Sequence, residues 1–108
     1  MNQTIQEPLE DFAAVIRDLS VTSTRIAQIE ESKATAASNR RHELLDGYIQ
    51  EEQAQILKLR GLEQRRLKMA EALGWKSLTF RQILEKATPE QDQLLRPLFL
   101  ELEQQLKR

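Results

Sequence analysis

Large apolar residues recur every three or four positions along most of this sequence, and few residues interrupt the pattern. Side chains at that spacing share one face of an α-helix, whereas a half-buried strand would require strict alternation. The 108 residues include only 3 glycines and 3 prolines, and the abundant Leu, Gln, Glu, Ala, Lys and Arg all favour helix. A chain of this length forms one domain rather than two. We therefore predict a single all-α domain over residues 1–108.

The first long helix is predicted at about residues 6–34. Its start is marked by Thr4 and Glu7, which have the spacing of a capping box, and by Pro8, which is tolerated in a first turn. Two heptad series follow: Phe12, Leu19 and Ile26, and Val15, Thr22 and Ile29. A sustained repeat of about 3.5 residues predicts packing along one partner helix.

A hairpin turn is predicted in the stretch KATAASN, residues 33–39, which has no large apolar residue. Ser38 or Asn39 is suited to cap the next helix. The alternative is that Ala34, Ala36 and Ala37 extend the first helix by a further turn. Both readings give an antiparallel helical hairpin.

The second long helix is predicted at about residues 40–73. Its inward stripe on a helical wheel consists of Leu45, Tyr48, Ile49, Ile56, Leu59, Leu67 and Ala70, with Leu62 and Leu73 at the margin. Glu52 and Glu63 fall inside this stripe, which costs free energy unless each lies at an edge, pairs across the seam or contacts a further partner. Gly47 and Gly61 either permit close approach of a neighbouring helix or are tolerated there.

The chain after Leu73 contains unusually clear stop and start signals. Gly74 is suited to end the second helix. Thr79 and Gln82 have capping-box spacing, which predicts a short connecting helix at about residues 80–86. Trp75 is interpreted as covering the apolar end of the hairpin, with a docking anchor for a partner as the alternative.

Thr88 with Pro89 and Gln91 repeats these start signals and predicts a third main helix at about residues 89–107. Its amphipathic stripe consists of Leu94, Leu95, Leu98, Phe99, Leu102 and Leu106. Pro97 within it predicts a kink or a later start. The pattern runs to the last residue without a cap, so the natural protein is expected to continue beyond Arg108.

Composition argues against several classes of function. The 16 Lys and Arg residues are balanced by 17 Asp and Glu residues, which gives no general attraction to nucleic acid or anionic membranes. The basic cluster of Lys58, Arg60, Arg65, Arg66 and Lys68 is spread around its helix and interleaved with glutamates, which indicates a solvated face. No segment is apolar enough to span a bilayer, so a soluble intracellular protein is expected.

Chemistry-bearing residues are sparse. The chain has no cysteine, and its one histidine, His42, has no second ligand at metal-binding spacing. Neither a nucleophile with an adjacent base nor a glycine-rich phosphate loop occurs. We therefore expect a protein that is not an enzyme and that needs no metal or cofactor.

The sequence from about Glu30 to Leu106 resembles the flagellar export chaperones of the FlgN type. The residues that carry the resemblance are LLDGYIQEEQAQILKLRGLEQRR, the pair Leu73–Gly74 and LTFRQIL. The resemblance implies a cytoplasmic chaperone that binds the C-terminal helices of hook-associated proteins, prevents their early assembly and delivers them to the type III export apparatus.

In this family the amphipathic C-terminal helix binds the client. The matching partner-binding positions here are Leu94, Leu95, Leu98, Phe99, Leu102 and Leu106. The family's final helix usually continues into an asparagine-rich aliphatic motif, whereas this sequence ends before one appears.

Two alternatives stay open from the residues themselves. The stripe of the third helix can pack on its own hairpin or on a partner, because six exposed apolar side chains need some cover. The alternative function is a coiled-coil homo-oligomerisation or adaptor domain without a client.

Overall fold

The computed structural model describes residues 6–106, with side chains from Pro8 onward, and it confirms the all-α fold over that range. Its four helices are α1 (Gln6–Ser38), α2 (His42–Ala72), α3 (Phe80–Lys86) and α4 (Pro89–Leu106). The bounds of α3 agree with the prediction from the capping signals. The described part of the chain contains no strand.

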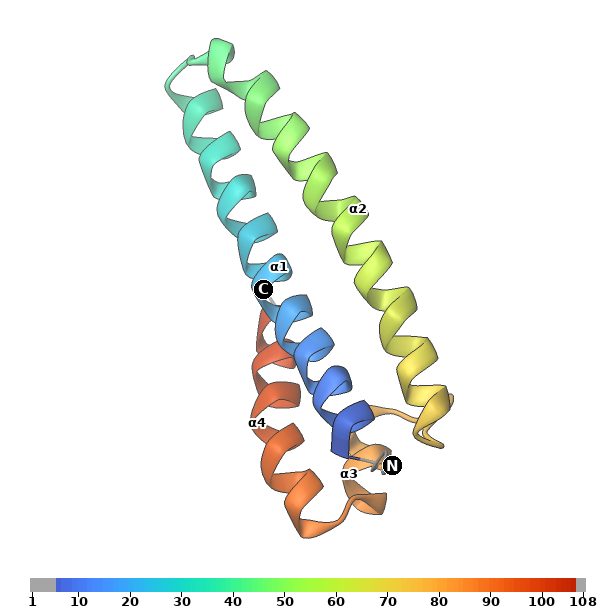
Figure 1. The fold of residues 1–108 in the computed structure, drawn as a ribbon. Coiled ribbons are helices and arrows are strands. Elements are labelled where there is room, and N and C mark those ends of the chain that lie inside the picture. Colours follow the sequence, from blue (N-terminus) through green and yellow to red (C-terminus); the bar gives the residue numbers. More distant parts are fainter. Residues whose placement is uncertain (1–5, 107–108) are drawn as a thin grey trace.

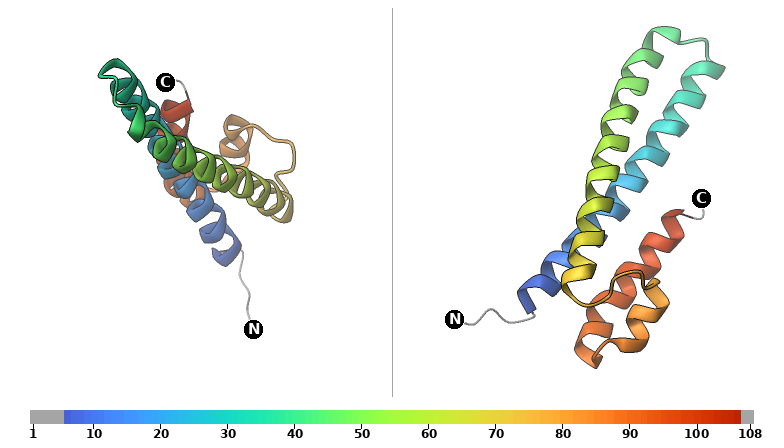
Figure 2. Two further views of the ribbon diagram at one scale, coloured as in Figure 1. Left: turned by 90° about the horizontal axis from the view of Figure 1, so that it is seen from above. Right: turned by 90° about the vertical axis from the view of Figure 1, so that its right-hand side faces the viewer.

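The two long helices form an antiparallel hairpin, and α4 folds back beside α1 (Figure 1). The molecule is elongated, with principal extents of 57 × 25 × 21 Å. Two further views show that α3 and α4 lie at the end of the hairpin where α1 begins and α2 ends (Figure 2). This end is called the proximal half below, and the half near the hairpin turn is called the distal half. The fold is therefore a bundle proximally and a bare helix pair distally.

Heptads run the length of both hairpin helices. On α1 the seam positions are Phe12, Val15, Leu19, Thr22, Ile26, Ile29, Lys33 and Ala36, and all of them are buried or partly buried. On α2 the corresponding positions are Leu45, Tyr48, Glu52, Gln55, Leu59, Leu62, Arg66, Met69 and Leu73, again all buried or partly buried. The predicted heptad series of α1 is confirmed, and α2 follows the same repeat.

The predicted inward stripe of α2 is partly wrong, because α2 follows a heptad repeat and not a straight wheel. Leu67 and Ile49, predicted to face inward, are 54% and 39% exposed, whereas Leu62, predicted at the margin of the stripe, is only 5% exposed. A straight wheel of 100° per residue drifts by about 20° per heptad relative to a supercoiled seam, so over 31 residues it misplaces some positions. Glu63 lies one position past Leu62 and is outside the seam.

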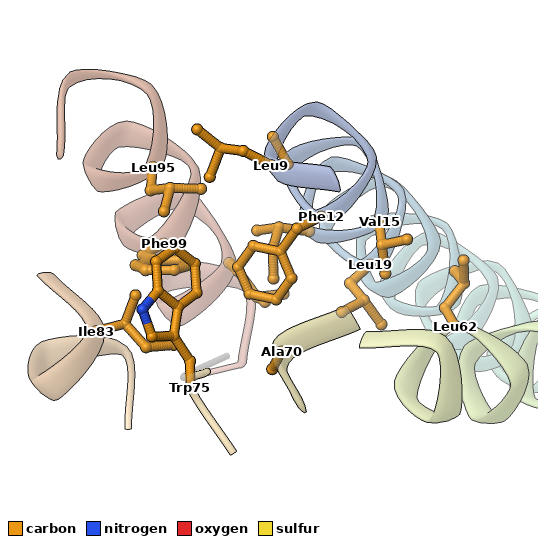
Figure 3. Packing of buried hydrophobic residues seen from close by; sticks show 13 residues of the cluster. Leu9, Phe12, Val15, Leu19, Leu62, Ala70, Trp75, Ile83, Leu95 and Phe99 are labelled. Carbon is orange, nitrogen blue, oxygen red and sulfur yellow. The ribbon is translucent and has the colours of Figure 1, made fainter. Parts of the chain in front are cut away.

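The largest core lies in the proximal half. Phe12 is fully buried and meets the Trp75 ring edge-on at 5.7 Å between ring centroids. Phe99 of α4 meets Phe12 edge-on at 6.3 Å and stacks on Phe80 at 4.1 Å. Figure 3 shows the Phe12, Trp75 and Phe99 rings with Leu95 and Ile83 around them. Trp75 is 7% exposed, so its interpretation as cover for the end of the hairpin is confirmed.

Local hydrogen bonds explain where the helices end and begin. Gly74 has a φ of +83°, and the N–H of Trp75 donates to the carbonyl of Ala70 at 2.8 Å, as in a Schellman motif. Thr79 Oγ1 accepts from the N–H of Gln82 at 3.1 Å, while Gln82 Oε1 accepts from the N–H of Thr79 at 2.9 Å. Thr88 and Gln91 make the same reciprocal pair at the start of α4.

The hairpin turn differs from the first prediction. Helix α1 continues to Ser38, so the alternative in which its alanines extend the helix is correct. The turn is confined to 39–41, with Arg40 at a φ of 57° and the N–H of Arg41 donating to the carbonyl of Ala36 at 2.7 Å. Helix α2 begins at His42 without a side-chain cap. Helix α1 extends to Ser38 because alanine favours helix strongly and residues 33–38 include no glycine or proline.

Some of the predicted residues lie at the two ends of the chain. Thr4 and the side chain of Glu7, which form the predicted cap of α1, lie outside the described residues, as does Lys107 at the end of the third helix. Gly47 and Gly61 do not serve close packing, because a Cβ at either position would have no heavy atom within 4 Å outside its own helix backbone.

Candidate functional site

The six predicted partner-binding residues divide into three groups by exposure. Leu95, Phe99 and Leu102 are 0%, 1% and 4% exposed and belong to the proximal core. Leu94 and Leu98 are partly buried against that core. Leu106 is 65% exposed. Of the two arrangements left open by the sequence, the structure thus shows α4 packed on its own hairpin.

A groove of about 520 Å³ opens at the C-terminal end of α4. Leu106 and Leu102 form its α4 side, while Leu19 and Ser23 contribute from α1. The remaining lining residues are Leu59, Glu63 and Arg66 of α2, Leu78 and Thr79 just before α3, Phe80 and Arg81 of α3, and Glu103 of α4. The groove is therefore an apolar channel with charged rims, built from all four helices.

One wall of this groove is held by an ion pair. Arg66 donates from Nε to Glu63 Oε1 at 2.6 Å and from Nη2 to Oε2 at 3.2 Å. Its guanidinium carbon lies 5.8 Å from the centroid of the Phe80 ring, and its side chain is only 17% exposed. Glu63 thus orients Arg66 over Phe80, at the edge of the seam. The rest of the basic cluster is exposed around α2, as predicted for a solvated face.

The second glutamate predicted inside the seam pairs across it. Lys33 of α1 donates from Nζ to Glu52 Oε1 at 2.8 Å, and these side chains are 29% and 14% exposed. Lys33 also contacts Glu30 Oε1 at 3.4 Å. Arg25 of α1 also pairs with Glu51 of α2. Two ion pairs thus join α1 to α2.

Among residues 8–106, no group of three or more His, Cys, Asp and Glu side chains is placed to hold a metal ion. None of the described helices is long and apolar enough to cross a membrane. His42 is exposed at the first position of α2.

Comparisons of the chain with protein-family models, with curated proteins and with solved structures gave no match. The functional proposal therefore depends on the residues and geometry of this chain. Sequence reasoning placed the site on α4 and missed the other groove walls, Leu19, Leu59 and Phe80. Leu19, Leu59 and Phe80 follow the ordinary apolar pattern of helix packing, so the sequence does not set them apart as groove residues. The signal that the sequence does contain is the pair of polar groove residues beside the seam, Ser23 and Glu63.

Proposed function

We propose that this protein is a cytoplasmic chaperone of flagellar type III export, similar to the FlgN type. It binds the C-terminal helices of hook-associated proteins, prevents their premature assembly and presents them to the export apparatus. The supporting observation is the apolar groove beside the last turn of α4, with Leu106 exposed at its edge. Such a groove suits the apolar face of an amphipathic client helix.

The exposed end of α4 makes the first contact with the client. Leu106 lines the groove from the α4 side, while Leu95 and Phe99 hold the rest of α4 on α1. Gln105 Oε1 and Ser20 Oγ are buried without a hydrogen-bond partner among the described residues. The client contacts the more deeply buried residues of the stripe, such as Leu102, only after the end of α4 loosens from α1.

Capture of a purified hook-associated protein tests the proposal. Leu106→Asp is compared with Leu100→Asp, because Leu100 is also on α4 and 54% exposed but does not line the groove. Burying one leucine is worth about 1.5–3 kcal/mol, so Leu106→Asp should weaken capture by roughly 10- to 100-fold while the control does not. Leu102 is unsuitable because it is 4% exposed and its substitution would disturb the core.

Two results would contradict this proposal at different levels. Wild-type protein that captures no hook-associated protein at micromolar concentration rejects the function. Capture that is equally strong with Leu106→Asp rejects the assigned site but leaves the function standing.

A coiled-coil oligomerisation domain is the second candidate, and one observation favours it. Leu67 of α2 is 54% exposed, outside the hairpin seam. Exposed leucines on a heptad helix are suited to pack against a second copy. Sedimentation velocity distinguishes this candidate, since Leu67→Asp would convert an oligomer to a monomer without loss of helix content.

A further inference from the structure

Heptad spacing places further side chains in line with the groove beside α4, along the distal half of the hairpin, and this face of the helix pair is called the valley below. On α2, Glu63 lines the groove, and Ile56 and Ile49 precede it at intervals of seven residues. On α1, Ser23 lines the groove and Glu30 follows seven residues later. A seven-residue interval keeps side chains in line along a supercoiled helix. Ile56 is partly buried and Ile49 is 39% exposed, so the valley stays apolar on its α2 side beyond the end of α4.

The floor of the valley continues the surface on which α4 already packs. Ala13 and Ser20 of α1 are 2% and 3% exposed. They follow Leu9 at helical spacing and so share its face, and Leu9 lies toward Leu95 of α4 (Figure 3). Ala27 and Ala34 continue the same seven-residue series into the distal half, where Ala34 is exposed. Small residues let a neighbouring helix approach closely, and the first two of the four are buried in the half of α1 beside which α4 lies. The face of α1 on which α4 packs therefore continues beyond the end of α4, and no other described helix covers it there (Figure 2).

Charge along the valley selects among partners. Two carboxylates, Glu30 and Glu52, share the single ammonium group of Lys33, at 3.4 and 2.8 Å. This group of three side chains therefore carries one excess negative charge. A lysine or arginine on the docked element complements it, whereas an acidic residue there is repelled.

We propose that the distal valley, defined by Ser23, Ala27, Glu30, Ile49 and Ile56, binds an amphipathic helix of a partner protein in line with α4. The partner helix presents aliphatic side chains every three or four residues and at least one lysine or arginine toward Glu30. The α1 segment from Ser23 to Ala34, along which the helix docks, is about 18 Å long and fits about three helical turns. The inference rests on the proposed function, because the partner helix is taken to belong to the client. Binding to the surface can nevertheless be tested without a client.

A synthetic helix is the probe for this surface. It is a fluorescently labelled 14-residue peptide of leucine and lysine at helical spacing, and its binding is followed by fluorescence anisotropy. Ile49→Asp should weaken binding at least tenfold. The matched control is Leu57→Asp, because Leu57 lies on the outer face of the same helix and is 65% exposed. Far-UV circular dichroism verifies that both variants keep the helix content of the wild type.

The charge requirement has its own comparison. A peptide with glutamate in place of lysine should bind several-fold more weakly, and Glu30→Gln should reduce that difference. Since the groups are near the surface, the difference should also shrink as salt is raised. Equal affinity of the two peptides at low salt would overturn the assignment of a cationic partner.

Other outcomes separate this inference from the function. Equal loss of peptide binding in Ile49→Asp and Leu57→Asp, or no loss in either, overturns the valley. A wild-type dimer that Ile49→Asp dissociates also overturns it, since a second copy then occupies the face. Capture of a hook-associated protein that Leu106→Asp weakens and Ile49→Asp leaves unchanged rejects the valley but not the function. Absence of any such capture, with peptide binding lost only in Ile49→Asp, rejects the function but not the valley.

Discussion

Phe99→Ala is the most direct test of the packing that attaches α4 to the hairpin. The Phe99 side chain is 1% exposed, stacks on Phe80 and meets Phe12 edge-on. It therefore joins three helices, and its removal leaves a cavity where they meet. Truncation of a buried phenylalanine costs about 3–5 kcal/mol, a range that includes the loss of two aromatic contacts. A domain of this size is stable by only about 5–15 kcal/mol in total.

The change is measured by urea unfolding with two probes. Far-UV circular dichroism follows all helices, and fluorescence follows Trp75, the single tryptophan, which lies in the same cluster. We expect a loss of at least about 3 kcal/mol, equivalent to a fall of roughly 15 °C in the thermal midpoint. Leu100→Ala on the exposed face of α4 should stay within about 0.5 kcal/mol of the wild type. If Phe99→Ala also costs less than about 1 kcal/mol, α4 is not packed on α1 in solution and the argument fails.

Three smaller predictions concern the helix ends. Thr79→Ala removes a capping box and should lower the free energy of unfolding by about 1 kcal/mol, measured by urea denaturation. Gly74→Ala places a Cβ at a φ of +83° and should cost about 1–2 kcal/mol, measured by thermal unfolding. The hydrogen bond from Arg96, and then its charge, lower the pKa of Asp92, so in Arg96→Gln the pKa measured by NMR titration should rise toward the ordinary aspartate value. Since that pKa is depressed by folding, the pair stabilises α4 above the unfolded pKa and the contribution disappears as pH falls through the folded pKa.

Local signals in the sequence were sufficient for the connections between the last three helices. Thr79 with Gln82, and Thr88 with Gln91, each form a reciprocal pair within four residues, so no distant contact is needed to decide them. Gly74 is likewise a local choice, since only its backbone must enter the left-handed region. The bounds of α3 could be predicted for this reason.

Features that depend on distant contacts were harder to predict. The hairpin turn lacks glycine and proline, so its position depends on where two heptad seams match rather than on a local stop signal. The sequence predicted Leu67 inside the stripe and Leu62 at its margin, whereas Leu62 is buried and Leu67 is exposed. The supercoil that decides this follows from the contact of α2 with α1. The groove joins residues as far apart as Leu19 and Leu106, and no sequence pattern indicates that they meet.

The two halves of the hairpin differ in how they are stabilised, and this difference supports a docking role for the distal half. The proximal seam is covered by α4 and joined to a cluster of buried rings. The distal seam includes the Lys33–Glu52 pair and begins at Thr22, whose buried Oγ1 has no hydrogen-bond partner among the described residues. Polar groups of this kind contribute little net stability, because desolvation offsets much of their attraction. A helix docked on Ile49 and Ile56 would supply the apolar cover that α4 supplies proximally, and it would stabilise the half of the hairpin that no third helix covers.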